Sequence, residues 1–199
     1  MTTQTTDVII SENGALFLLP DPVTCFRSAS YTQTQTFRLS RDASVVALDW
    51  VTSGRIALGE EWVFSRYYSA NQVWVDGELI TKDVMLLSED GDMMRRVLPR
   101  RSLLDRLSPY SCYATLILYG SMVKSVIREM TTEYEGTTVQ KATNPAPLIW
   151  SLSPISDGGG CIVRVAGQET ELVRNRIAGL LRGLEGIIGV DMYRKAFHE

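Results

Sequence analysis

Histidine is almost absent from this sequence. The single one, His198, lies one residue from the C-terminal end. Triad catalysis uses an imidazole as general base, and imidazole is also a frequent ligand of transition metals. The composition therefore argues against Ser-His-Asp and Cys-His catalysis, and against a histidine-based metal site within one chain.

Cysteine is scarce as well. The sequence has three cysteines, an odd number, far apart and without a C-x-x-C pair. A disulfide framework or a structural zinc site needs thiols that are closer together or more numerous. We therefore expect three separate, reduced and partly buried thiols at Cys25, Cys112 and Cys161.

Long apolar runs and a strong net charge are missing too. No apolar run reaches the roughly 18 residues of a membrane span, and the N-terminal residues lack the basic and apolar regions of a secretory signal. The formal net charge of −3 offers no broad attraction to nucleic acid or anionic lipid. With 45% hydrophobic and 22% charged residues over 199 positions, the sequence predicts a globular, cytoplasmic protein.

The first half of the sequence shows the period-two alternation that is typical of strands. Residues 8–19 predict two short strands around a hairpin turn at Asn13-Gly14. Pro20-Asp21-Pro22 ends the second strand, because proline removes a ladder donor. Further strands are predicted at residues 30–40, 44–51, 62–68, 72–76 and 78–87, with turns at Ser53-Gly54 and Asp76-Gly77.

After Glu89 the pattern becomes mixed. The run CYATLILYG predicts a strand, and SMVKSVIREM predicts a helix with Ser121 as its N-cap. Residues 131–147 are polar and suit an exposed loop. The remaining elements are strands at 148–153 and 160–166 and a helix at 169–186.

At least eight candidate strands are too many for one flat sheet, so two packed layers are predicted. The expected fold is a single β-dominated domain over residues 1–199. Its β-rich part covers residues 8–88, and a mixed α/β part covers residues 89–199.

The densest group of candidate functional residues is DWVTSGRIALGEEW, residues 49–62. Asp49, Glu60 and Asp83 lie on or beside neighbouring predicted strands and can line one cavity. Three interpretations stay open. Each acid taken singly suits a buried structural pair with an arginine such as Arg55. Two acids together suit acid–base chemistry, as in glycoside hydrolysis. Alternatively they pass a divalent cation, which lone carboxylates bind weakly compared with imidazole or thiolate.

Several of these stretches resemble the urease accessory family UreD/UreH. LPDPV at Leu19–Val23 is similar to the family's W/L-P-x-P-x segment, and LDWVTSGRIALGEEW at Leu48–Trp62 is similar to its W-D-W strand followed by G-R-x-x-x-G-E. The resemblance continues through Phe64–Asp83 and through GGGCIVRVAGQETELVRNRIAGLL, so that it covers nearly the whole chain. The sequence of residues 14–26 most resembles the eukaryotic, especially the fungal, branch of the family. The matching motif positions are Pro20, Asp21, Pro22, Trp50, Gly54, Arg55 and Gly59.

The resemblance implies a fold and a role. The family is similar to a two-layer, β-helix-like array of strands with a helical C-terminal part, and its members are not enzymes. They bind UreF, which recruits the nickel GTPase UreG, and the complex docks on apo-urease. No cofactor is tightly bound, but nickel is expected to pass transiently through a tunnel lined partly by acidic residues.

Carried over position by position, Asp49 matches the Asp of the W-D segment and Asp83 matches an acidic position after D-G. These two are the tunnel candidates, and Glu60 is a weaker one because pairing with Arg55 suits a structural role. Partner contact is expected on the C-terminal helix, which is equally suited to cover its own sheet. The partner-binding candidates are Leu172, Val173, Arg176 and Leu180.

The sequence also departs from the family pattern. Family members carry a longer N-terminal section with a G-G-D segment and a T-Q-x-x-T-K segment, so we expect an N-terminally shortened member. Two other hypotheses stand beside the nickel conduit. One is a small β-rich hydrolase that uses paired carboxylates, and the other is a non-functional truncated product.

Overall fold

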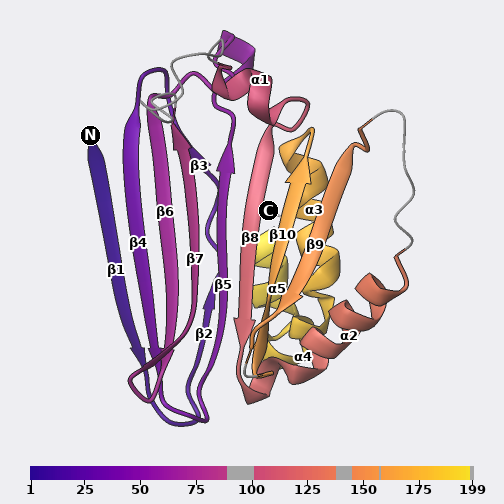
Figure 1. The fold of residues 1–199 in the computed structure, drawn as a ribbon. Coiled ribbons are helices and arrows are strands. Elements are labelled where there is room, and N and C mark those ends of the chain that lie inside the picture. The colour runs from indigo at the N-terminus through magenta and orange to yellow at the C-terminus, as the bar shows by residue number, and fades with distance from the viewer. Residues whose placement is uncertain (89–100, 138–144, 157, 198–199) are drawn as a thin grey trace.

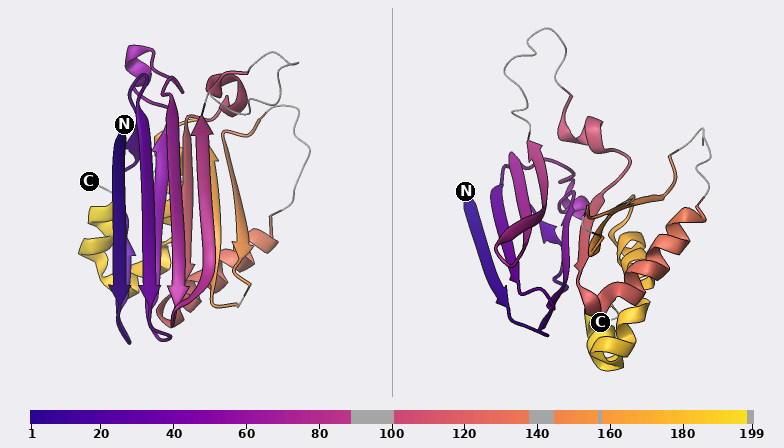
Figure 2. Two further views of the ribbon diagram at one scale, coloured as in Figure 1. Left: turned by 60° about the vertical axis from the view of Figure 1, so that its left-hand side comes forward. Right: turned by 60° about the horizontal axis from the view of Figure 1, so that its bottom comes forward.

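The computed structural model describes residues 1–88, 101–137, 145–156 and 158–197. Two β-sheets pack face to face, and a layer of helices covers the far face of the second sheet (Figures 1 and 2). The predicted β-dominated, layered architecture with a helical C-terminal part is confirmed. Among the described residues, no helix has the length and apolar character needed to cross a membrane.

The first sheet, here called sheet A, has the strand order β1-β4-β6-β7. The first three strands run parallel, and β7 returns antiparallel to β6 through a turn at Asp76-Gly77. Both turn residues have positive φ (48° and 86°), as a tight hairpin turn requires. The strands span Thr2–Ile10 (β1), Ser30–Leu39 (β4), Arg66–Val75 (β6) and Glu78–Ser88 (β7).

The second sheet, sheet B, has the order β2-β5-β8-β10-β9, and β3 also pairs with β5. Its interior strand β5 is buried at all nine positions, because sheet A covers one face and the opposite face lies in the core under the helices. The strands span Ala15–Leu18 (β2), Val23–Thr24 (β3), Ser44–Thr52 (β5), Cys112–Tyr119 (β8), Leu148–Pro154 (β9) and Gly160–Gly167 (β10).

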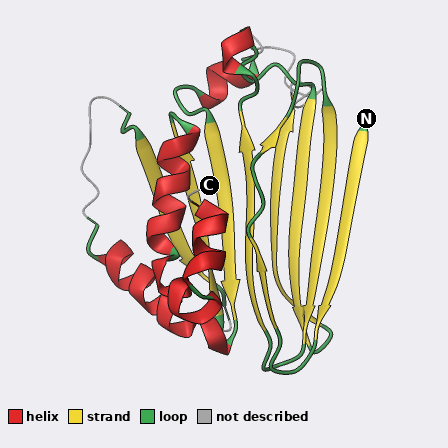
Figure 3. Ribbon diagram, turned by 180° about the vertical axis from the view of Figure 1, so that it is seen from behind, coloured by secondary structure: helices red, strands yellow, loops and turns green. Residues whose placement is uncertain are grey.

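The helices after β8 cover the face of sheet B that is turned away from sheet A and face the viewer in Figure 3, whereas α1 lies at one end of the sheets (Figure 1). Two arginines of α3 stack on tryptophans of the sheet: Arg174 lies 5.2 Å from the Trp50 ring and Arg176 lies 4.2 Å from the Trp150 ring. The helices are α1 (Leu103–Leu107), α2 (Lys124–Glu135), α3 (Thr170–Leu180), α4 (Glu185–Ile188) and α5 (Val190–Phe197). Short 3-10 turns are η1 (Ile56–Leu58), η2 (Ser121–Val123) and η3 (Arg182–Leu184).

The space between the two sheets holds two separate apolar clusters. One contains Phe37, Val45 and Ile117, and the other contains Val51 and Tyr67. The strand positions between these clusters carry buried polar side chains instead. A polar layer therefore crosses an interface that is apolar at both of its ends.

The prediction of a hairpin at residues 8–19 is wrong, because its two strands do not pair with each other. Strand β1 begins at Thr2 and pairs with β4 in sheet A, whereas β2 pairs with β5 in sheet B. The Asn13-Gly14 turn is present, with Asn13 at φ 58° and Gly14 N–H donating to Ser11 O at 2.9 Å. It carries the chain from one layer to the other, because both strands find their partners far away in sequence.

Three further boundaries differ from the prediction. The two predicted strands at 62–68 and 72–76 are replaced by one strand, β6, which begins only at Arg66 and ends at Val75; its inward Ser69 and Asn71 interrupt the apolar alternation. Residues 131–135 belong to α2 rather than to a loop, Ser121 begins η2 rather than capping α2, and Met122 is 42% exposed. The predicted 169–186 helix ends at Leu180 and continues as η3 and α4. Strands at 30–40, 44–51, 78–87, 148–153 and 160–166 are confirmed.

Candidate functional site

Asp49 is the centre of the polar layer. It lies on β5, is 8% exposed, and its two carboxylate oxygens accept hydrogen bonds from four side chains of sheet A. A carboxylate offers about four lone-pair positions, so all of them are in use. The donors are Gln33 Nε2 (3.1 Å) and Tyr67 Oη (3.2 Å) to Oδ1, and Ser69 Oγ (2.5 Å) and Asn71 Nδ2 (2.7 Å) to Oδ2.

Two tyrosines orient these donors. Burial, followed by the charge of Asp49, raises the pKa of Tyr67, so its hydroxyl stays protonated and donates. Tyr31 stacks on the Tyr67 ring with centroids 5.8 Å apart, and its hydroxyl, which has one hydrogen to donate, lies 2.8 Å from both Gln33 Oε1 and Gln4 Oε1. When it donates to Gln33, it favours the amide orientation in which the Gln33 nitrogen faces Asp49.

Asp83 makes a second contact between the sheets. It is buried on β7, and its Oδ1 accepts a short hydrogen bond from Arg164 Nη2 of β10. The Arg164 side chain is 47% exposed. The ion pair therefore joins a buried carboxylate to a cation at the surface.

The strand register connects the two carboxylates. Asn71 is the cross-strand neighbour of Asp83, and Thr115 lies between Asp49 and Arg164 across sheet B. With the Asn71–Asp49 hydrogen bond and the Asp83–Arg164 ion pair, these five residues form a closed ring that spans both sheets. We use "polar layer" for this ring together with Gln33, Tyr67 and Ser69.

Two oxygen atoms of the ring are buried without a hydrogen-bond partner in the described part of the chain. They are Asn71 Oδ1 and Thr115 Oγ1. Buried polar atoms are normally satisfied, so two unsatisfied oxygens beside two carboxylates are unusual. Asn71 Oδ1 can only accept a hydrogen bond, whereas the Thr115 hydroxyl can donate one or accept one.

A cavity of about 260 Å³ lies at the Arg164 end of the polar layer. Its walls are mostly apolar, and its polar lining comes from Thr115, Ser151 and Arg164. Arg164 on β10 is the cross-strand neighbour of Thr115 on β8 on one side and of Ser151 on β9 on the other. The apolar part of the wall includes Met85, Tyr113, Ile149 and Ala166.

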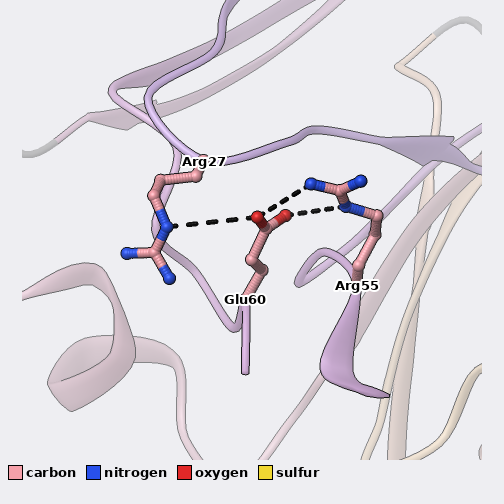
Figure 4. Close-up of polar contacts among 3 residues, drawn as sticks. All are labelled: Arg27, Arg55 and Glu60. Carbon is pink, nitrogen blue, oxygen red and sulfur yellow. Dashed lines mark hydrogen bonds and ion pairs between the residues drawn. The ribbon is translucent and has the colours of Figure 1, made fainter. Parts of the chain in front are cut away.

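Glu60 lies outside this layer. Its carboxylate accepts two hydrogen bonds of 2.8 Å from Arg55 and is 4.0 Å from Arg27 (Figure 4). The hydrogen bonds from Arg55 lower the pKa of Glu60. Gly54, at φ 130°, lets the backbone pass close to the Glu60 carbonyl, where a Cβ would collide. The arrangement matches the structural acid–arginine pair that the sequence left open.

The motif residues near Pro20 fasten a loop. Trp50 Nε1 donates to the Pro20 carbonyl at 2.8 Å, and Asp21 pairs with Arg174 at 3.4 Å. Thus the Pro20-Asp21-Pro22 segment is tied to β5 and to α3.

The partner-binding candidates occupy different environments on α3. Leu172 is 36% exposed, whereas Val173 and Leu180 are buried in the core between the helices and sheet B. Arg176 is held between the Trp150 ring and Glu133, to which Nη1 donates at 2.7 Å. Of the three apolar candidates, only Leu172 reaches the surface.

The described residues contain no group of three or more His, Cys, Asp or Glu side chains that could hold a metal ion. The three cysteines are free and buried, and burial raises the pKa of their thiols to about 11 (Cys25) and about 12 (Cys112 and Cys161). The polar layer itself holds two carboxylates, neutral amide and hydroxyl groups, and the guanidinium of Arg164.

Sequence reasoning selected Asp49 and Asp83 but missed their neighbours. The overlooked residues are Gln33, Ser69, Asn71, Thr115 and Arg164. One signal was available for four of them: Gln33, Ser69, Asn71 and Thr115 occupy buried positions of strands, where apolar residues are expected, whereas Arg164 is the exposed position of β10.

Fold and site together define a two-sheet β protein with a buried carboxylate layer between its sheets and helices on one outer face. A comparison with protein families gives the family: the model of the "UreD urease accessory protein" family matches residues 1–195. The chain belongs to the UreD family of urease accessory proteins.

Curated relatives agree with this assignment. The chain is 33% identical to urease accessory protein D of Arabidopsis thaliana, over 92% of this chain and 67% of the relative. It is 31% identical to urease accessory protein 4 of Cryptococcus neoformans var. grubii, over 97% and 62%. It is 33% identical to urease accessory protein UreD of Sorangium cellulosum, over 94% and 55%. The chain thus spans between about half and two thirds of the length of these relatives.

Proposed function

We propose that this protein is a non-catalytic, cytoplasmic subunit of the machinery that matures urease, and that it conducts nickel to the apo-enzyme. Its partners would be UreF-like and UreG-like accessory proteins and apo-urease. Membership of the UreD family and the names of its relatives support a role in urease maturation. Nickel is the cargo in this proposal, not a resident cofactor.

The observation that carries the conduit is the polar layer. Burying charges between two sheets costs free energy, and apolar residues of similar volume often give equal or greater stability. Here Asp49 and Asp83 are buried in an interface that is apolar at both ends. A row of oxygen atoms between two sheets offers a divalent cation a path through an otherwise apolar interior.

The chemistry of the row suits transit rather than storage. Carboxylate, amide and hydroxyl oxygens hold nickel less tightly than imidazole or thiolate would. Among the described residues, Asn71 Oδ1 has no hydrogen-bond partner and could contact a cation. The Ser69 hydroxyl, which donates to Asp49, can turn its lone pairs toward a cation. Asp49 would supply negative charge while its four donors keep it in place.

The hydrolase alternative is disfavoured by the same geometry. Acid–base hydrolysis needs one carboxyl group to give a proton and another to activate water or attack the substrate. Asp49 has all its acceptor positions filled, and Asp83 is bound to Arg164. Asp49 therefore has no free position for a substrate water, and Asp83 is paired with a guanidinium instead of standing opposite a second carboxyl group that could exchange a proton with it.

Glu60 is proposed to support the loop rather than to touch nickel, because Arg55 and Arg27 already surround it. Contact with an accessory partner is proposed for the exposed side of α3, where Leu172 reaches the surface. The buried face of the same helix serves its own sheet.

The conduit is tested with two isosteric variants, Asp49→Asn and Asp83→Asn. Each is co-expressed with urease and the other accessory proteins, and urease activity and nickel content are measured after purification. Removing a charge on the path should reduce activation by about tenfold or more, since even outer-shell partners of metal sites typically contribute ~10–100-fold. Complex formation, followed by size-exclusion chromatography, should be retained.

Asp7→Asn is the matched control. Asp7 carries the same functional group but lies exposed on β1 in a pair with Arg38. Full activation by both test variants would remove the polar layer from the nickel path. Loss of activation in the control as well would show that the assay reports general charge or folding defects.

A further inference from the structure

The Asp83–Arg164 ion pair presents a difficulty for cation passage. A divalent cation at Asp83 would meet the positive guanidinium of Arg164 at close range, and like charges at such distances repel strongly. As long as Arg164 holds Asp83, this carboxylate is closed to nickel. The path therefore needs a way to move Arg164.

The surroundings of Arg164 give its side chain room to move away from Asp83. Its side chain is 47% exposed, so no packed core must open for it to move. The cavity of about 260 Å³ lies directly beside it, and is many times the roughly 30 Å³ that one water molecule takes up. Met85 and Ile149 offer apolar walls for the aliphatic stem, and Ser151 offers a hydroxyl for the guanidinium.

The oxygens around Asp83 fit a cation better than a guanidinium. Asn71 Oδ1 and Thr115 Oγ1 are buried and unpartnered within the described residues, and both belong to cross-strand neighbours of the ion pair. An arginine has only donors and could satisfy them, but among the described residues of the layer Arg164 donates to Asp83. A divalent cation would gain from all three side chains.

We propose that Arg164 is a displaceable counter-ion which occupies Asp83 in the resting protein and swings into the adjacent cavity when a divalent cation binds Asp83, Asn71 Oδ1 and Thr115 Oγ1. Arg164 thus controls when this step of the path is open. It also prevents cations in bulk solvent from entering through the cavity side. The functional part of this inference rests on the proposed nickel conduit, but the exchange itself can be measured without urease.

The test is a calorimetric titration of the full, untagged chain with nickel chloride at neutral pH. Arg164→Gln removes the competing charge and should bind one Ni²⁺ about tenfold or more tightly than the wild type, since the repulsion between the guanidinium and the metal ion is gone. The double variant Arg164→Gln/Asp83→Asn should lose this gain. Arg38→Gln is the matched control, because it breaks an ion pair with Asp7 on the outer face of sheet A and should bind as the wild type does.

A second variant protects the test against a folding defect. Arg164→Lys keeps the positive charge but lacks the planar fork of arginine, and it should bind Ni²⁺ with an affinity between those of the wild type and Arg164→Gln. Wild-type affinity in both variants would overturn the proposal. A gain that persists in the double variant would overturn it too, because the cation would then bind elsewhere.

The outcomes separate this inference from the conduit. If Arg164→Gln gains affinity through Asp83 but Asp83→Asn still activates urease fully, the counter-ion exchange stands and the conduit fails. If Asp83→Asn abolishes activation but Arg164→Gln binds no better, the conduit stands and the counter-ion exchange fails.

Discussion

Replacing Asp49 by alanine or by asparagine should have very different effects on stability. Alanine removes the acceptor of four buried donors, and each donor left without a partner costs about 1–3 kcal/mol. Gln33 Nε2 keeps a second acceptor in Ser69 Oγ at 3.3 Å, and some groups will turn. We therefore expect Asp49→Ala to lower the free energy of unfolding by about 3–5 kcal/mol, as for a broken buried pair.

Asparagine preserves most of the network. Its oxygen can keep the bonds from Gln33 and Tyr67, while its nitrogen faces Ser69 Oγ and Asn71. The hydroxyl can accept, and the Asn71 amide can turn its unpartnered oxygen toward the new donor. Only the charge assistance is lost, so Asp49→Asn should cost about 1–2 kcal/mol.

The assay is urea unfolding followed by tryptophan fluorescence, with linear extrapolation to water. The sequence has four tryptophans, of which Trp50 and Trp62 are buried and report on both sides of sheet B. Asp7→Ala, which breaks an exposed pair with Arg38, serves as the reference and should cost about 1 kcal/mol or less. Equal costs for the two Asp49 variants, or a cost below about 1 kcal/mol for alanine, would refute the four-donor network as a determinant of stability.

Three further predictions concern other parts of the molecule. Gly120→Ala should lower the free energy of unfolding by about 2 kcal/mol or more, because Gly120 has φ 108° and a Cβ would collide with Ala43 O and Ser44 Oγ; Gly179→Ala, in open space on α3, should instead raise it by about 0.5–1 kcal/mol. Iodoacetamide at pH 8 should leave the native thiols unlabelled and should label all three after denaturation, since burial raises their pKa to about 11 or 12; mass spectrometry would expose a mistake as labelling of the native protein at Cys25, Cys112 or Cys161. Arg55 lowers the pKa of Glu60, so the ionised carboxylate stabilises the fold above its unfolded pKa, and this stabilisation is lost as pH falls through the folded pKa. The difference in unfolding free energy between the wild type and Glu60→Gln should therefore shrink from pH 7 to about pH 3. A difference that stays constant over this range would contradict the prediction.

Local signals were enough for much of the fold. The alternation in residues 30–40 and 78–87 predicts β4 and β7, and the apolar run at 44–51 predicts β5, because these patterns depend only on which face of a strand is buried. The Asp76-Gly77 turn is equally local, since positive φ at both positions favours these residue types. The family resemblance also lies in contiguous motifs and is confirmed by the family match.

The failures of sequence reasoning have a common cause. The predicted hairpin at residues 8–19 is wrong because β1 and β2 pair with strands far along the chain, in different sheets. Strand β6 was divided in two because Ser69 and Asn71 face inward without being apolar. In both cases the partner across the interface, not the local pattern, decides the structure.

The sequence by itself determined the strand periods and the tight turns, and it singled out Asp49 and Asp83 as candidate acids. Only the tertiary structure decided that Glu60 pairs with Arg55 apart from them, and that Asp49 and Asp83 share one ring of residues. That ring takes its members from five strands of two sheets, and Arg164 lies 81 positions from the Asp83 it neutralises. Contacts at such separations arise from the packing of one sheet on the other, which no local pattern of residues encodes.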